Sequence, residues 1–498
     1  MWQGVSLILN FLSMFVVVPY LTSEPTTYGI YTICISISIF LAYADLGFMA
    51  AGQKYAAEFF AKGNRDEEMK VIGFTNFILL VFLIVFSIGF IILSSHPELL
   101  IKNLTPGKQE SIASSLFLIL ALFTPVTLLQ RLLQMIFGIR LEDYVVQRNN
   151  IVASLIKILS VLWFFRKGEY NIVGYFLFVQ IVNLLVALIT LLIARNRYKY
   201  NFKALIKSIH FDKNVFVKTK NLAFTSLYLT FTWILYYELD PAAIGKFLGS
   251  NQVAVYAIGL TLLSFFRSIQ GILFAPFNAR FNHLIGISDH DGLKSLFTAV
   301  TTLMAPIIII PIITIFLMAK PLILSWVGVQ YTGSVTIAQF LILCNLFAFI
   351  TYPTSLLLMA QERIREMYIV NTIIPVVYWG GIVLSYSEFG LNSFAIFKFV
   401  AFSISAIVYF SIMQKYLDFS ITRVMQCYVY PILLPAIFLF SVAYLISGYM
   451  PLEKSKMNLL IVLVTSGIMI LLSYLIVYFS SSYFKGQSRK VFATLWNV

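Results

Sequence analysis

The stretch Tyr28–Phe48, YGIYTICISISIFLAYADLGF, reappears in a weaker form at Val253–Leu273 as VAVYAIGLTLLSFFRSIQGIL. Each copy is an apolar run of about 20 residues, the length with which an α-helix crosses the hydrocarbon core of a membrane. Each is followed by a polar turn, and a second matching pair, FGIRLEDYVVQ and AQERIREMYIVN, keeps nearly the same offset. The repeat predicts two halves in the same orientation, related by a pseudo-two-fold axis along the membrane normal.

The composition of the whole chain agrees with this interpretation. The sequence has 498 residues, of which 60% are hydrophobic and only 11% are charged, whereas charged residues make up about a quarter of a typical soluble protein. The three cysteines lie apart inside apolar runs, so neither a disulfide framework nor a zinc site is indicated. We therefore expect an all-α polytopic membrane protein.

Apolar stretches long enough to span a membrane number fourteen. They lie near residues 4–22, 28–52, 71–95, 111–137, 148–165, 171–195, 221–247, 251–275, 293–318, 334–360, 368–387, 392–414, 427–448 and 457–480. This spacing predicts an N-lobe of six helices (1–195), a basic amphipathic cytoplasmic linker (196–220), a C-lobe of six helices (221–414), and two further helices with a cytoplasmic tail (415–498).

Basic residues fall mainly in one set of alternate loops. Of the 35 Lys and Arg residues, 25 lie on one side of the expected spans and nine on the other. Because cytoplasmic loops carry the excess of positive charge, both termini are predicted to be cytoplasmic. The net charge of +14 is then mostly a consequence of topology, and we expect no nucleic-acid partner.

The expected loops are too short to hold a soluble catalytic domain. No G-x-x-x-x-G-K-[ST] motif is present, and the four histidines are not placed near carboxylates at metal-ligand spacing. A two-lobed helical bundle of this kind is typical of a secondary transporter that works by alternating access, so we expect neither an enzyme nor a bound cofactor.

Three stretches carry a resemblance to a known family. They are LTSEPTTYGIYTICISISIFLAYADLGFMAAGQKYAAEFFAKGNRDE, ELDPAAIGKFLGSNQVAVYAIGL and KPLILSWVGVQY. With spans arranged as six, six and two, the chain resembles the polysaccharide flippases of the O-antigen (Wzx) type, in the multidrug/oligosaccharidyl-lipid/polysaccharide (MOP) exporter superfamily. One departure is that such flippases usually have a longer, basic N-terminus, whereas this chain begins three residues before its first expected span.

The resemblance implies a substrate and a place of action. The substrate would be an undecaprenyl-pyrophosphate-linked oligosaccharide of the kind used in lipopolysaccharide biosynthesis, moved from the inner to the outer leaflet of a bacterial inner membrane. Glycosyltransferases and a polysaccharide polymerase are implied as partners, together with the membrane lipids.

An anionic, sugar-bearing headgroup needs a wet cavity with cationic and amide side chains, and charges at membrane depth are the place to look for it. Lys157 lies near the middle of its expected span, where it either lines a cavity or pairs with a neighbouring helix. Arg131 has Gln134 three residues later, and Arg267 has Gln270 at the same spacing. These five residues are our candidates for substrate binding, because arginine matches phosphate oxygens with two parallel hydrogen bonds. The alternative for both arginines is an anchoring role at the membrane interface.

Three carboxylates within the expected spans are candidates for gating or for binding a coupling ion, Na⁺ or H⁺. Asp45 lies in the inner third of the second span, and Glu238 and Asp240 lie in the outer part of the seventh. The alternatives are a helix-end carboxylate that reaches water or a basic residue for Asp45, and a pair with Lys246 for the other two.

Two other functions remain open. A cation-coupled multidrug exporter of the same superfamily would need carboxylates more than interior bases. A membrane polysaccharide polymerase or glycosyltransferase would resemble chains with a large outer loop or acidic catalytic loops, and the longest outer loop expected here is short.

Overall fold

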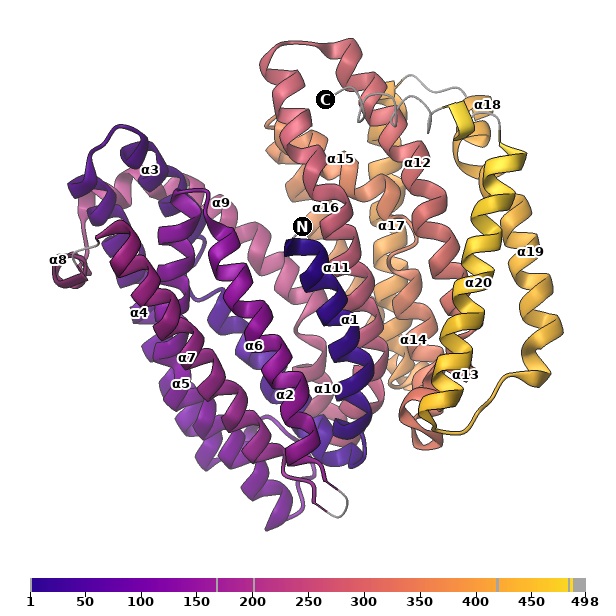
Figure 1. The fold of residues 1–498 in the computed structure, drawn as a ribbon, viewed down its shortest axis with the longest axis horizontal. Coiled ribbons are helices and arrows are strands. Elements are labelled where there is room, and N and C mark those ends of the chain that lie inside the picture. The colour runs from indigo at the N-terminus through magenta and orange to yellow at the C-terminus, as the bar shows by residue number, and fades with distance from the viewer. Residues whose placement is uncertain (1, 167–168, 200–201, 418–420, 482–483, 487–498) are drawn as a thin grey trace. The chain divides into compact units, whose positions relative to one another are not determined.

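The computed structural model describes residues 2–166, 169–199, 202–417, 421–481 and 484–486 (Figure 1). These residues form helices and turns with no strand, which confirms the all-α prediction. Among them, ten helices are long and apolar enough to cross a membrane, or eleven when one bent pair is counted as a single span. The chain is therefore a multi-pass membrane protein. It divides into two compact units, Met1–Ala254 and Val255–Val498.

Among the described residues, ten α-helices lie within the first unit, and an eleventh begins there. They are α1 (Trp2–Leu21), α2 (Pro25–Ala42), α3 (Phe48–Ala61), α4 (Arg65–Ser95), α5 (Lys108–Ile139), α6 (Asp143–Phe164), α7 (Ile172–Tyr198), α8 (Phe202–Lys207), α9 (Lys213–Tyr237) and α10 (Asp240–Leu248), followed by α11 (Ser250–Gly286). The unit extends past the expected N-lobe and takes in α9 and α10. The expected boundaries of the lobes stay a prediction.

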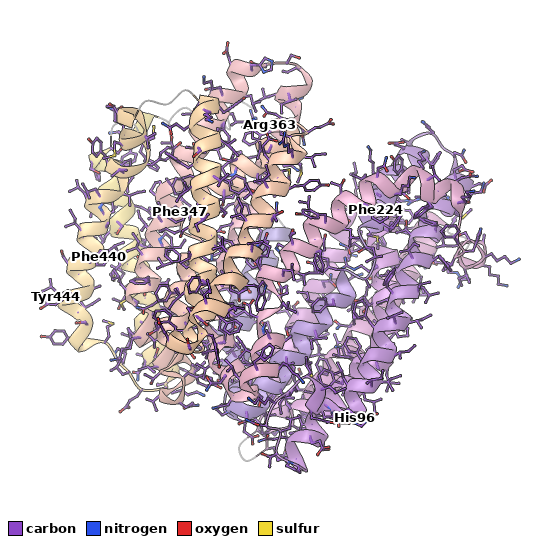
Figure 2. All side chains as sticks on the ribbon, turned by 180° about the vertical axis from the view of Figure 1, so that it is seen from behind. His96, Phe224, Phe347, Arg363, Phe440 and Tyr444 are labelled. Atoms are coloured by element: carbon purple, nitrogen blue, oxygen red, sulfur yellow. The ribbon has the colours of Figure 1, made fainter. Side chains whose placement is uncertain are left out.

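In the part of the second unit that the structure describes, the rest of α11 is followed by nine further α-helices. They are α12 (His290–Leu317), α13 (Ala319–Val327), α14 (Ser334–Leu343), α15 (Ala348–Ala360), α16 (Ile364–Phe389), α17 (Asn392–Leu417), α18 (Ile421–Val424), α19 (Tyr430–Ile446) and α20 (Lys456–Ser480). On α19, Phe440 and Tyr444 point away from the helices of this unit and are 54% and 82% exposed (Figure 2). Aromatic side chains that face outward from an apolar helix are typical of a surface in contact with the membrane.

Three of the fourteen expected spans are broken rather than continuous. The second span consists of α2 and α3, the seventh of α9 and α10, and the tenth of α14 and α15, which meet at 45°. In the second span, Gly47 has a φ of +79°, a conformation that glycine adopts without the steric cost met by other residues. A Cβ at this position would lie 2.3 Å from the carbonyl oxygen of Ala223. The break therefore lies directly against α9.

Aromatic side chains join α9 to the broken span. Phe48, the first residue of α3, stacks on Phe216 with ring centroids 5.9 Å apart, and Tyr43 packs edge-on against Trp233 at 5.3 Å. Within the expected linker, Ser208 donates a hydrogen bond to the carbonyl of Met69 at the start of α4. The residues that follow α7 thus pack closely on the first unit; residues 200–201 of the linker and 487–498 of the tail lie outside the described residues.

An ion pair is buried where α4 begins and α5 ends. The guanidinium of Arg140 lies 2.7 Å from the carboxylate of Glu68, and the two side chains are only 5% and 2% exposed. Arg140 also donates to the carbonyl of Ile136 and lies over the rings of Phe60 and Tyr198, at 4.5 and 4.9 Å from their centroids. One arginine thus joins α3, α4, α5 and α7 at this end of the unit.

Candidate functional site

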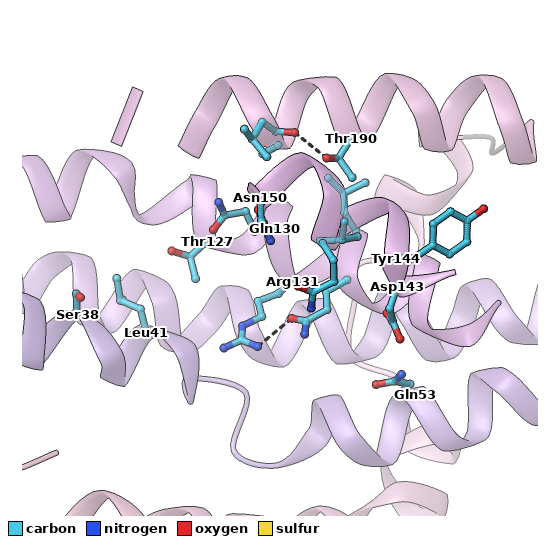
Figure 3. A pocket seen from close by; sticks show the side chains of 16 residues that line it. Ser38, Leu41, Gln53, Thr127, Gln130, Arg131, Asp143, Tyr144, Asn150 and Thr190 are labelled. Atoms are coloured by element: carbon cyan, nitrogen blue, oxygen red, sulfur yellow. Dashed lines mark hydrogen bonds between the residues drawn. The ribbon is translucent and has the colours of Figure 1, made fainter. Parts of the chain in front are cut away.

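A cavity of about 820 Å³ opens within the first unit, between α2, α3, α5, α6 and α7 (Figure 3). This volume is within the usual range for small-molecule sites, about 300–1,000 Å³. Its lining is mostly polar and comprises Ser38, Leu41, Gln53, Thr127, Gln130, Arg131, Leu133, Gln134, Asp143, Tyr144, Val146, Gln147, Asn150, Val186, Ala187 and Thr190.

Helical periodicity explains how the polar side chains come together. Thr127, Gln130, Arg131 and Gln134 follow one another on α5 at spacings of three, one and three residues, which puts them on one face of that helix. On α6, Asp143, Gln147 and Asn150 are four and three residues apart and share a face in the same way. The cavity is therefore bordered by two polar helix faces and contains two charged groups and five carboxamides.

Arg131 and Gln134, two of the expected substrate-binding residues, lie in this cavity. The guanidinium of Arg131 donates a hydrogen bond to Oε1 of Gln134 at 3.1 Å (Figure 3). A guanidinium carries five N–H donors, and a carboxamide carries two N–H donors and an acceptor oxygen. Their role in substrate binding stays a prediction.

Asp45 lies next to the cavity, in the break between α2 and α3. Its Oδ2 accepts a hydrogen bond from the backbone N–H of Met49 at 2.8 Å, which satisfies one of the free donors at the start of α3. The half-buried carboxylate also interacts electrostatically with the guanidinium of Arg131. The structure thus places a gating candidate and a substrate-binding candidate close together.

Lys157 lies on α6 outside the lining of this cavity. Its Nζ donates to Oδ1 of Asn183 on α7 at 2.6 Å, and Nδ2 of Asn183 donates in turn to Gln180. Lys157 is seven residues beyond Asn150, or about 10 Å along the helix. This contact matches the alternative of a pair with a neighbouring helix, and the expected role in the substrate path stays a prediction.

Arg267 and Gln270 lie on α11 in the second unit. Gln270 is buried, and its Nε2 donates to the carbonyl of Asn345, in the break between α14 and α15, at 3.4 Å. Asn345 donates to the carbonyl of Leu263, one turn before Arg267. Arg267 is half-buried and interacts electrostatically with Tyr352. The five expected substrate-binding residues are therefore divided between the two units.

Glu238 and Asp240 lie in the first unit at the break between α9 and α10, and both are buried. Lys246, proposed as their partner, donates to the carbonyl of Leu99 at 2.5 Å. Within the described part of the chain, no three His, Cys, Asp or Glu side chains are grouped in a way that could hold a metal ion. The coupling role of these carboxylates stays a prediction.

Sequence reasoning missed the α6 side of the cavity and also Gln53 and Thr127. The signal was present in the seven-residue spacing from Asp143 to Asn150. Asp143 and Gln147 fall between the expected spans 111–137 and 148–165, so the sequence predicts a loop there.

Comparison with known proteins gives structural relatives only. No protein-family model and no curated protein sequence matches the chain. A structure described as lipid II flippase MurJ in an inward closed conformation matches with a TM-score of 0.63 and 14% identity, over 96% of this chain and 97% of that one. An inward-facing multidrug resistance MATE family transporter of the MOP superfamily matches with a TM-score of 0.65 and 13% identity, over 83% and 94%. A MOP superfamily transporter from Pyrococcus furiosus matches with a TM-score of 0.50 and 11% identity, over 84% and 93%. These matches establish that the chain has the fold of the MOP superfamily transporters.

Proposed function

We propose that this protein is a flippase for lipid-linked oligosaccharides. It would move an undecaprenyl-pyrophosphate-linked repeat unit of a surface polysaccharide from the inner to the outer leaflet of a bacterial inner membrane by alternating access, with both termini cytoplasmic. Glycosyltransferases would supply the substrate, and a polymerase would use the product. A coupling ion, Na⁺ or H⁺, belongs to the same proposal.

The observation that carries the proposal is the chemistry of the cavity in the first unit. One arginine and five carboxamides line it. A guanidinium binds phosphate oxygens through charge-assisted hydrogen bonds, and carboxamides both donate to and accept from sugar hydroxyls. The MurJ structure, described as a lipid II flippase, matches over nearly the whole of both chains and supports a lipid-linked substrate.

A cation-coupled multidrug exporter is the second candidate. It is favoured by the two carboxylates at the cavity, Asp143 in the lining and Asp45 next to Arg131, and by the likeness to a MATE transporter. Arg131 counts against it, because a positive charge in the cavity repels a cationic drug. The third possibility, a membrane polymerase or glycosyltransferase, has no support among the structural relatives, which are transporters.

Proteoliposomes that contain only this protein provide the test. We expect a radiolabelled undecaprenyl-pyrophosphate oligosaccharide to cross the bilayer, and imposed Na⁺ and pH gradients will identify the coupling ion. Arg131→Gln should abolish transport. Arg363→Gln is the matched control, because Arg363 pairs with Glu366 on α16 at 2.7 Å and is not among the residues that line the cavity; this variant should transport normally. Efflux of a cationic dye without movement of the lipid would instead establish the multidrug exporter.

A further inference from the structure

The two charged groups of the cavity, Arg131 on α5 and Asp143 on α6, lie apart. Arg131 precedes the last residue of α5, Ile139, by eight residues, or about 12 Å of helix. Asp143 is the first residue of α6, just after the turn that follows α5. Figure 3 shows Asp143 close to Gln53, with the guanidinium of Arg131 pointing away from both. The cavity thus has a cationic end and an anionic end.

Gln53 and Asp143 border the same space over the end of α5. A Cβ at Gly138 would lie 2.5 Å from Nε2 of Gln53 and 3.3 Å from Oδ1 of Asp143. These two side chains therefore lie within a few ångströms of one point, although they come from α3 and α6. Gln147 lines the cavity one turn along α6 from Asp143.

The negative charge of Asp143 determines which part of an anionic glycolipid can bind next to it. An ionised carboxylate only accepts hydrogen bonds, and its two oxygens can take two neighbouring hydroxyl donors. It repels a phosphate, and it forms stronger hydrogen bonds with neutral donors than an amide does. The amides of Gln53 and Gln147 add donors and acceptors on either side of it.

We propose that Asp143, Gln53 and Gln147 form a carbohydrate subsite that binds the hydroxyl groups of a neutral sugar, while the phosphate is held at Arg131. This inference rests on the proposed function and adds an orientation of the headgroup, with the glycan at the turn between α5 and α6. It also adds a specificity: a neutral sugar binds at Asp143, and a sugar acid is rejected by its negative charge.

Binding measurements on the full-length protein in nanodiscs test the subsite without any transport step. The probes are inorganic pyrophosphate for the cationic end, and maltose, lactose and di-N-acetylchitobiose for the subsite. Asp143→Asn should weaken binding of the sugar that binds most tightly by about tenfold or more, as expected when a hydrogen bond to a charged group is lost, and should leave pyrophosphate binding unchanged or slightly tighter. Arg131→Gln should do the reverse.

Two further variants separate the subsite from a general effect on folding. Gln53→Ala should also weaken sugar binding selectively. Asp66→Asn removes another first-turn carboxylate, at the exposed start of α4, and should change neither affinity. The affinities for glucose and glucuronate test the specificity, because Asp143→Asn should bind glucose in preference to glucuronate less strongly than the wild type does.

The proposal of a carbohydrate subsite is refuted if no disaccharide of the panel binds the wild type at concentrations up to its solubility. It is equally overturned if Asp143→Asn leaves sugar affinity unchanged, or if that variant lowers pyrophosphate and sugar binding alike. Failure of the flippase itself would appear differently, as Asp143-dependent sugar binding by a protein that moves no lipid-linked sugar in proteoliposomes.

Discussion

Replacing Glu68 by glutamine should destabilise the first unit by about 3 kcal/mol. The carboxylate of Glu68 lies 2.7 Å from Arg140, and both side chains are at least 95% buried, so the substitution leaves a buried guanidinium without its counter-ion. Breaking such a pair by removing one partner costs about 3–5 kcal/mol. We expect the lower end, because Arg140 keeps its hydrogen bond to Ile136 and its contacts with two aromatic rings.

Thermal unfolding of the purified protein, followed by fluorescence-detected gel filtration, measures this effect. For a unit of this size the loss corresponds to a decrease in Tm of about 6–12 °C. The neighbouring Glu67→Gln is the matched control, because Glu67 pairs with Lys70 at the surface, where an ion pair contributes about 1 kcal/mol or less. In a double-mutant cycle with Arg140→Met, the double variant should cost less than the sum of the single ones, by about 1–3 kcal/mol. Equal Tm values for the two glutamine variants, or strict additivity in the cycle, would refute the reasoning.

Three other predictions concern the broken span and the lysine on α6. Gly47→Ala should destabilise the protein by about 1–3 kcal/mol more than Gly107→Ala, because both positions have positive φ but only Gly47 lies against a neighbouring backbone. The decrease in Tm of each variant measures this difference, and equal decreases would show that the close contact is unimportant. Asp45→Asn should keep the hydrogen bond from the N–H of Met49 and unfold within about 0.5 kcal/mol of the wild type, while its transport in proteoliposomes falls. Asp45→Ala removes the acceptor and should lose about 1 kcal/mol as well. Normal transport by the asparagine variant would exclude a role for the charge. Lys157→Ala should abolish transport without loss of folded protein. Lys157→Arg can still donate to Asn183 and should retain part of the transport activity. Full transport by the alanine variant would show that Lys157 has a purely structural role.

Hydropathy predicted the helical class correctly, but it did not predict where the helices break. The first copy of the repeat breaks at Tyr43–Gly47, whereas the second continues through Arg267 and Gln270 as one helix. The physical difference is local. Gly47, the N-cap residue of α3, takes a positive φ, and Asp45 accepts a hydrogen bond from the N–H of Met49 in the first turn of that helix. The matching position of Gly47 in the second copy is Ile272, and a β-branched residue strongly disfavours a positive φ. Reading Asp-Leu-Gly as a stop and restart signal would have predicted the break.

Polar side chains that share one helix face were predictable from the sequence, and contacts between helices were not. The spacing of Arg131 and Gln134 predicted a shared polar face, and both residues lie in the cavity. The pairing of Arg140 with Glu68 joins residues 72 positions apart, and no local pattern reveals it. Arg140 therefore counted only as one more cytoplasmic positive charge. The burial of Arg140 depends on how α4 and α5 pack against each other, and a single sequence does not reveal that packing.

The packing of α9 against α3 also bears on how the chain is made. The first unit includes α9 and α10, so it cannot close when α7 leaves the ribosome and must wait for about fifty more residues. During that interval Phe48 of α3 packs against Phe74 of α4 but lacks its contacts with Phe216 and Phe224 of α9. A chain truncated after α8 should therefore be degraded rapidly in cells, and supplying α9 and α10 as a separate polypeptide should rescue it.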